Sequence, residues 1–177
     1  GGISVLSNQT WSFFDTSNTN FLTEWVRSIV VDANNNKWVG FYGNGIMKYD
    51  NTTWTPYQLS DTLGSNSILT LKIDNQNNLW AGTLNGVSKL DGTNWSYFTE
   101  ADGLVDNNVY SIAFDQQNNA WYGTSNGLSF FNGTNWQTFN TSNSGLANNN
   151  IFSIYIDNQN NKWFGTNNGL SKFDGTN

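Results

Sequence analysis

Four short segments contain an aspartate followed by asparagines and glutamines, the residue types that could coordinate a hard cation. The four aspartates are spaced by 42, 41 and 42 residues: Asp32, Asp74, Asp115 and Asp157. Calcium requires six to eight oxygen ligands, usually with several carboxylates, whereas each segment offers one carboxylate. The alternative is a hairpin turn in which the aspartate accepts hydrogen bonds from the backbone amides that follow it. The sequence favours the turn, so no metal site is predicted.

Acid–base catalysis has few candidate residues in this chain. It contains neither histidine nor cysteine, which excludes an imidazole base, a Ser-His triad and a typical zinc site. The remaining candidates are carboxylates between repeats, namely Glu24, Asp61, Glu100, Asp102 and Asp106. Two of them could form a pair for glycoside hydrolysis in space, but their pattern is that of surface charges. We therefore expect no enzymatic activity and no cofactor.

Ligand binding is better supported, at positions that differ between repeats. Five residues before each aspartate stand Arg27, Leu69, Tyr110 and Phe152. Trp25 occurs where the other repeats have Ser or Asn, and Tyr42 lies in a connection one residue longer than its counterparts. Aromatic faces stack on sugar rings, and a guanidinium offers a fork of donors. We predict a ligand site formed by Trp25, Arg27 and Tyr42, with Tyr110 and Phe152 as further candidates; alternatively, Arg27 pairs with a loop carboxylate and the aromatics fill space.

The secondary structure that carries these residues can be predicted from two tryptophans that recur with the same period. The recurring residues are Trp38, Trp80, Trp121 and Trp163, and Trp11, Trp54, Trp95 and Trp136. A repeat of about 42 residues with β-rich composition indicates a propeller. In one repeat we predict strands at 109–114, 120–124, 128–131 and 136–139. Asn126-Gly127 provides a strong hairpin signal between the second and third.

The predicted fold is an all-β propeller of four-stranded antiparallel blades, with residues 1–177 forming one domain. The repeats span 26–57, 68–98, 109–139 and 151–177, and 2–14 supply the outer strands of a preceding blade. Because the first segment matches the third strand of the other repeats, we expect part of a larger propeller, with a small ring as the alternative. The first set of tryptophans should pack between blades. The glycine two residues after each should allow close backbone approach.

Composition narrows the classes of partner. Charged residues are 11% of the chain and the net charge is −6, so no basic patch is present for nucleic acid. No apolar run approaches the length of a membrane span, and the absence of cysteine excludes disulfides. The chain has 32 asparagines, a residue that favours tight turns. We predict no nucleic-acid partner and no membrane insertion.

The repeat resembles the two-component regulator propeller repeat. The motif residues are Ser111, Ile112, Asp115, Asn119, Trp121, Gly123, Thr124, Asn126, Gly127, Leu128 and Ser129, and again Ser153, Ile154, Asp157, Asn161, Trp163, Gly165, Thr166, Asn168, Gly169, Leu170 and Ser171. The resemblance implies large propellers, often seven-bladed, in the extracytoplasmic sensor regions of bacterial hybrid histidine kinases. Such sensors commonly respond to oligosaccharides. The same repeats occur in secreted or surface proteins without a kinase.

Together these observations predict a non-enzymatic binding or sensing propeller in an extracytoplasmic location, whether periplasmic, cell-surface or secreted. An oligosaccharide or another protein is the expected partner, and open blade edges could support self-association. The alternative is a structural or protein-interaction module of a secreted or surface protein with no small ligand.

Overall fold

The computed structural model describes residues 1–57 and 64–175, and these residues form five antiparallel β-sheets. The predicted all-β propeller is confirmed. None of the described residues lies in a helix long and apolar enough to cross a membrane. The strands are β1 (Ile3–Ser7), β2 (Thr10–Phe14), β3 (Val26–Val31), β4 (Lys37–Phe41), β5 (Ile46–Tyr49), β6 (Trp54–Tyr57), β7 (Ile68–Ile73), β8 (Leu79–Thr83), β9 (Gly86–Leu90), β10 (Trp95–Phe98), β11 (Val109–Phe114), β12 (Ala120–Thr124), β13 (Gly127–Phe131), β14 (Trp136–Phe139), β15 (Ile151–Ile156), β16 (Lys162–Thr166) and β17 (Gly169–Phe173).

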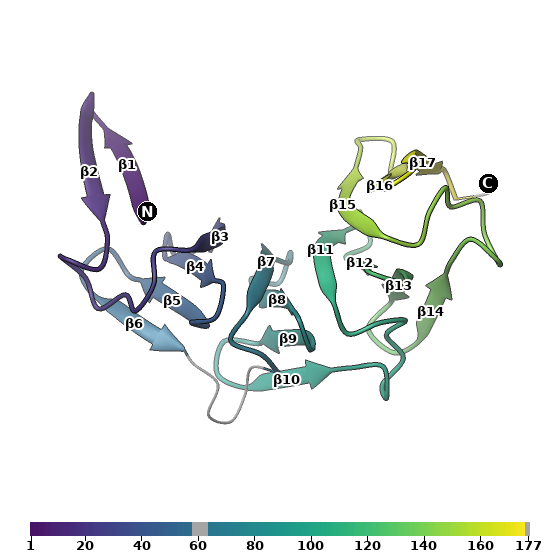
Figure 1. Ribbon diagram of the computed structural model, residues 1–177, viewed down its shortest axis with the longest axis horizontal. Helices are drawn as coiled ribbons and strands as arrows, with labels where there is room; N and C mark the ends of the chain where they lie inside the picture. Colours follow the sequence, from purple (N-terminus) through teal and green to yellow (C-terminus); the bar gives the residue numbers. More distant parts are fainter. Residues whose placement is uncertain (58–63, 176–177) are drawn as a thin grey trace.

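Three sheets are complete blades of four consecutive strands. Their orders are β3-β4-β5-β6, β7-β8-β9-β10 and β11-β12-β13-β14, and we call them blades 1, 2 and 3. Blade 4 contains β15-β16-β17, and the β1-β2 hairpin precedes blade 1. Figure 1 shows the sheets arranged as an open arc, with β3, β7, β11 and β15 on the concave side and β6, β10 and β14 on the outer rim. The structure is therefore an incomplete propeller.

Because the strands of each blade are antiparallel, successive turns lie at opposite ends of the blade. The two sets of blade ends form the two faces of the propeller. The Asp-turn face carries the turns between first and second strands, at 32–36, 74–78, 115–119 and 157–161. The tip face carries the hairpin tips between second and third strands, at 42–45, 84–85, 125–126 and 167–168, together with the loops that lead into each blade. Backbone hydrogen bonds join tip and loop, for example from Gly86 N to Asn107 O at 2.7 Å.

The apolar core lies between blades rather than inside any one of them. Trp38 of blade 1 packs in a cluster with Ile68 and Leu71 of blade 2, and Trp80 packs in the next cluster with Val109 and Ile112 of blade 3. These tryptophans are buried, as the sequence predicted. Burying aromatic side chains of this size supplies much of the hydrophobic stabilisation available to a repeat protein.

In blades 1 to 3, the glycine two residues after the tryptophan is required by the approach of the next blade. A Cβ atom on Gly82 would lie 2.8 Å from the carbonyl oxygen of Val109, the first residue of the next inner strand. A Cβ on Gly123 would lie 2.8 Å from Cγ2 of Ile151 in the same way. Real Cβ atoms do not approach that closely, so only glycine fits. The predicted role of these glycines is confirmed.

Candidate functional site

The repeated aspartate organises each turn on the Asp-turn face. Asp74 Oδ1 accepts hydrogen bonds from the backbone amides of Gln76 and Asn78, at 3.0 and 2.8 Å. Its Oδ2 accepts from Asn78 Nδ2 at 2.8 Å and from Trp80 Nε1 at 2.9 Å. Asp32, Asp115 and Asp157 make the same four bonds in their own turns. The hairpin-turn interpretation is confirmed, because protein donors already occupy both carboxylate oxygens.

In two of the turns, these donors hold the carboxylates of Asp32 and Asp157 in the charged form. The Trp163 indole N–H and the Asn161 amide lower the pKa of Asp157 to about 2. For Asp32, partial burial raises the pKa, but the donors from Asn36 and Trp38 outweigh it and the pKa is lowered. Hydrogen bonds to an ionised carboxylate favour that form. The turns of Asp32 and Asp157 are thus stabilised by charge-assisted bonds at neutral pH.

Sequence reasoning predicted that the tryptophans pack between blades, but it missed their bond to the aspartate. The signal was present, because each pair is six residues apart in all four repeats, from Asp32 to Trp38 and likewise onward. A buried indole N–H needs an acceptor. The Asp and the Trp therefore recur as one unit.

A second feature that the sequence did not reveal joins neighbouring turns. Asn118 in blade 3 has a left-handed backbone (φ 63°), and its Oδ1 accepts a hydrogen bond from the Asn75 amide of blade 2 at 3.1 Å. Asn77 and Asn160 bind the preceding blade in the same way, through the amides of Ala33 and Gln116. Asparagine tolerates this backbone conformation better than most residues. The Asp-turn face is therefore a continuous hydrogen-bonded scaffold.

On the tip face, the predicted ligand residues of the inner strands occupy an equivalent β-bulge. The pairing of first and second strands shifts register around Arg27, Leu69, Tyr110 and Phe152. A β-bulge re-aims a side chain out of the regular alternation and is common at functional positions. The bulge places the residues that vary between repeats at the same point of each blade.

The structure brings the predicted residues together in two pairs. The Trp25 and Tyr42 rings have centroids 6.2 Å apart at 40°, and the Tyr42 amide donates to the Trp25 carbonyl at 3.0 Å. Both side chains are exposed, Trp25 to 68% and Tyr42 to 41%. The Tyr110 and Phe152 rings are 5.6 Å apart at 34°. The pairs come from opposite halves of the arc.

Arg27 is exposed, and no hydrogen bond, ion pair or ring contact joins its side chain to another residue of 1–57 or 64–175. The predicted alternative, in which it pairs with a loop carboxylate, is therefore not realised in the described part of the chain. The guanidinium is available to solvent at the bulge that follows Trp25.

The carboxylates considered for catalysis serve the loops instead. Asp102 Oδ2 accepts from the Thr99 amide at 2.9 Å, and Glu100 Oε1 accepts from the Asn107 amide at 3.2 Å. Asp106 accepts from Ser125 Oγ at 2.8 Å, and Glu24 pairs with the Gly1 amino group at 3.1 Å. Asp61 lies outside the described residues. No group of three or more acidic side chains in the described ranges could hold a metal ion.

Comparison with known families finds a match in three of the repeats. The family model "Two component regulator propeller" matches residues 62–85, 103–126 and 145–168. Three of the repeats are therefore similar to the two-component regulator propeller repeat. Each match covers a stretch from the loop that leads into a blade to the following hairpin tip, so the family motif includes the Asp turn and the glycine of close approach. No curated protein sequence matches the chain.

Solved structures share the fold. The extracellular domain of a B. thetaiotaomicron protein described as a hybrid two component system superposes with a TM-score of 0.84 at 24% identity, over 93% of this chain and 24% of that one. A second extracellular domain from B. thetaiotaomicron, described as part of a one component system, has a TM-score of 0.80 at 23% identity, over 97% and 25%. A catalytically inactive histidine-to-alanine variant of virginiamycin B lyase from Staphylococcus aureus has a TM-score of 0.67 at 14% identity, over 86% and 56%. The chain spans about a quarter of the two extracellular domains.

Proposed function

We propose that this chain is a non-enzymatic ligand-binding segment of an extracytoplasmic sensor or surface propeller, and that it recognises a neutral oligosaccharide on the tip face. The observation that supports this most strongly is the exposed Trp25–Tyr42 pair. Blade 1 alone among the four carries two adjacent aromatic rings at these positions, where the equivalents are Ser67 and Leu84 in blade 2.

The chemistry of the pair suits a sugar. An exposed aromatic ring offers an apolar face for the C–H side of a pyranose, and Arg27, two residues after Trp25, offers a planar fork of donors for hydroxyl oxygens. The backbone bond between Tyr42 and Trp25 fixes the main chain from which the two rings project, which reduces the conformational entropy lost on binding. Tyr110 and Phe152 extend the proposed surface along the bulges of blades 3 and 4.

An extracytoplasmic location is proposed from the repeats and from the two B. thetaiotaomicron domains, which are described as extracellular. The proposed lack of catalysis has separate support. The virginiamycin B lyase that shares the fold is inactive when a histidine is replaced, and these 177 residues contain no histidine. Each of the described loop carboxylates binds a nearby protein group, and they are Glu24, Glu100, Asp102 and Asp106.

A glycan array tests the proposal. The chain should bind one class of neutral glycan, and Trp25→Ala with Tyr42→Ala should reduce binding by roughly a hundredfold if two stacking contacts are lost. Arg27→Ala should have a smaller effect. Leu84→Ala, at the hairpin tip of blade 2 that corresponds to Tyr42, is the matched control and should bind normally.

Two outcomes would contradict it. Glycan binding that survives the Trp25 and Tyr42 substitutions would place the site elsewhere. A complete lack of glycan binding would favour the alternative function, a structural or protein-interaction module without a small ligand.

A further inference from the structure

A serine on the third strand fixes the incoming loop in three of the four blades. The Ser129 hydroxyl accepts a hydrogen bond from the Val105 amide at 2.9 Å, and Ser171 accepts from Ala147 at 2.9 Å. Ser88 accepts from Gly64 at 3.3 Å in blade 2. These serines are buried, so the bond draws each loop down onto its blade. We call this contact the serine clip.

Blade 1 lacks the serine clip. Met47 occupies the position of the serine, and the residue that should donate is Leu22. A thioether is at best a weak acceptor, and no hydrogen bond from the Leu22 amide to another described residue is present. The loop of blade 1 therefore lies over apolar side chains instead of being tied to the strand.

A second substitution acts at the same place. Pro56 pairs with Met47 across β5 and β6, where Tyr97 pairs with Ser88 in blade 2. The Tyr97 ring lies against Gly64 of the loop, and its hydroxyl donates to the Asn85 carbonyl. Proline cannot reach either partner. Blade 1 therefore lacks both the clip and the aromatic cover found in blade 2.

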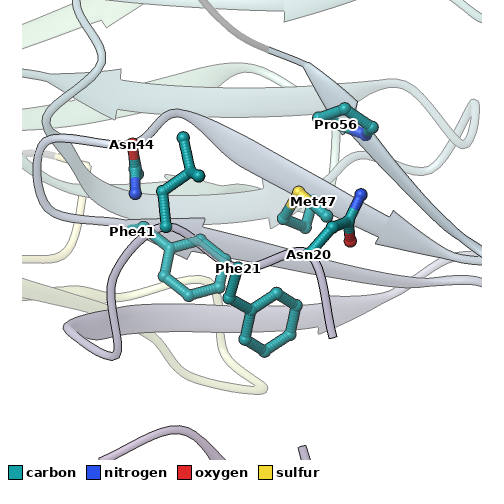
Figure 2. Close-up of a pocket in the computed structure, with 7 residues that line it drawn as sticks. Asn20, Phe21, Phe41, Asn44, Met47 and Pro56 are labelled. Atoms are coloured by element: carbon teal, nitrogen blue, oxygen red, sulfur yellow. The ribbon is translucent and has the colours of Figure 1, made fainter. Parts of the chain in front are cut away.

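A cavity of about 230 Å³ lies beside Met47 and Pro56 in blade 1. Its lining consists of Asn20, Phe21, Leu22, Phe41, Asn44, Met47 and Pro56. Figure 2 shows the Phe21 and Phe41 rings side by side, with Asn20 beside Met47 and Asn44 on the other side of the phenylalanines. The two rings meet edge to face, with centroids 5.0 Å apart. The cavity therefore has an aromatic floor.

The polar side chains of the lining are two amides, of which Asn20 is exposed and Asn44 is half-buried. No hydrogen bond joins the side chain of Asn20 or Asn44 to any residue of the described ranges, in contrast to turn asparagines such as Asn78, which binds Asp74. No charged side chain lines the cavity. An ion would lose hydration here without gaining a counter-charge, whereas a neutral group with a donor and an acceptor would satisfy an amide.

We propose that this blade 1 cavity binds a small neutral molecule with an apolar ring and an amide or hydroxyl group at one edge. The ring occupies the space over Phe21, Phe41 and Met47, and the polar edge meets Asn44 and Asn20. The volume, below the 300–1,000 Å³ usual for drug-sized ligands, limits the occupant to about one ring. The site goes beyond the proposed glycan surface, because neither Trp25 nor Tyr42 lines it.

The single methionine of the chain allows a direct test. In protein carrying a ¹³C-methyl methionine, the Met47 methyl gives one NMR signal from inside the cavity. Benzamide, a ring with an amide edge, should shift this signal saturably at millimolar concentration or below. Benzoate has the same shape with a negative charge and should bind at least roughly tenfold more weakly, a difference of about 1.4 kcal/mol.

Two variants locate the site. Pro56→Tyr restores the aromatic cover of blade 2 on an exposed position and should abolish the response to benzamide. Thr55→Tyr adds the same ring to the neighbouring exposed residue, which points to the opposite side of the strand, and should leave the response intact. Asn44→Ala should weaken benzamide several-fold while preserving the fold.

The results can also overturn the inference. A Met47 signal that benzamide does not move up to roughly 10 mM would show that no such site exists. An equal response to benzoate would contradict the neutral class, and normal binding by Pro56→Tyr would contradict the location. Trp25→Ala should leave benzamide binding unchanged, so failure of the glycan proposal and failure of this one are distinguishable.

Discussion

The two faces of the propeller are built from the same repeat but differ in how much their residues recur from blade to blade. On the Asp-turn face, each aspartate accepts four hydrogen bonds, and the asparagines link neighbouring blades. On the tip face, the bulge residue and the first residue of the hairpin tip differ in every blade, and several aromatic rings are exposed. Recurrence therefore marks the scaffold, and variation marks the surface that is available for recognition.

Blade 1 shows the contrast most clearly. Its aspartate turn has the bonds of the other turns, with Asp32 accepting from Asn34, Asn36 and Trp38. Its tip face departs from the repeat at Trp25 and Met47. Blade 1 can accommodate these substitutions on its tip face because its Asp turn and the interblade core hold the blade in place.

The largest effect should follow from loss of the aspartate in a central blade. Asp74→Ala leaves the buried Trp80 indole N–H and two turn amides without their acceptor. We expect the free energy of unfolding to fall by about 3 kcal/mol or more, since bonds to charged groups contribute about 1.5–3 kcal/mol each. Urea denaturation of the variant and the wild type measures this difference in the free energy of unfolding.

Asp74→Asn is the control for this change. Its Oδ1 can still accept from the turn amides, so about half of the loss should be recovered. An alanine variant as stable as the wild type would show that the aspartate does not hold the turn.

The next effect concerns the close approach of blades. Gly82→Ala would place a Cβ 2.8 Å from the Val109 carbonyl, and we expect a loss of about 2 kcal/mol from the resulting strain. Gly145→Ala is the matched control, because a Cβ there meets nothing within 4 Å. Equal stabilities of the two variants in urea would contradict the close-approach role.

A smaller effect should measure the bond between turns. Asn118→Gly keeps the backbone freedom that a left-handed residue needs and removes the acceptor of the Asn75 amide, so the expected loss is about 1 kcal/mol. Asn35→Gly removes the equivalent side chain in blade 1, whose Oδ1 accepts only from Lys37 of its own turn. Because Asn118 Nδ2 also donates to Gln76 Oε1 of blade 2, the difference between the two variants gives the joint contribution of both cross-blade bonds.

Acid should weaken the Asp-turn face. The folded pKa of Asp157 is about 2, below its ordinary value of 3.8. A depressed carboxyl pKa stabilises the fold above the unfolded value, and the contribution is lost as the pH falls through the folded value. The thermal midpoint should therefore drop between about pH 4 and pH 2, and less steeply in Asp157→Asn. A midpoint that is flat over this range would contradict the assignment.

The smallest effect on stability should come from the tip face. Trp25→Ala with Tyr42→Ala removes exposed rings, so we expect a change within about 0.5 kcal/mol. The same variant should show the largest loss of ligand binding. A strong loss of stability would instead make the aromatic pair part of the scaffold and would remove the contrast between the faces.

Much of the fold could be predicted because the same strand and turn signals occur in all four repeats. The period, the Asn-Gly hairpin and the β-rich runs placed four strands between residues 109 and 139, and the structure has them there. The aspartate turn could be chosen over a calcium loop by counting carboxylates. The Asp–Trp hydrogen bond could have been predicted from the constant spacing of the two residues.

The candidate site was less accessible to the same reasoning. Variation between repeats singled out Trp25, Arg27 and Tyr42, and the structure shows that Trp25 and Tyr42 meet. Variation between repeats did not reveal the importance of Met47. Met47 replaces a serine whose hydroxyl, in the other blades, accepts a hydrogen bond from a loop amide 24 residues earlier. The sequence does not show that bond, because it depends on where the loop lies in three dimensions. The cavity of blade 1 therefore had no signal in the sequence.

By itself the sequence determined the repeat, the strands, the turns and the absence of histidine and cysteine chemistry, since these depend on local propensities and residue type. The tertiary structure decided which side chains from different blades meet: the asparagine that binds its neighbour's amide, the glycine beneath the next strand, the aromatic pair and the unclipped loop over Met47. Those contacts depend on how far each blade is rotated against the next, a quantity set by packing of the whole interblade core rather than by any one segment.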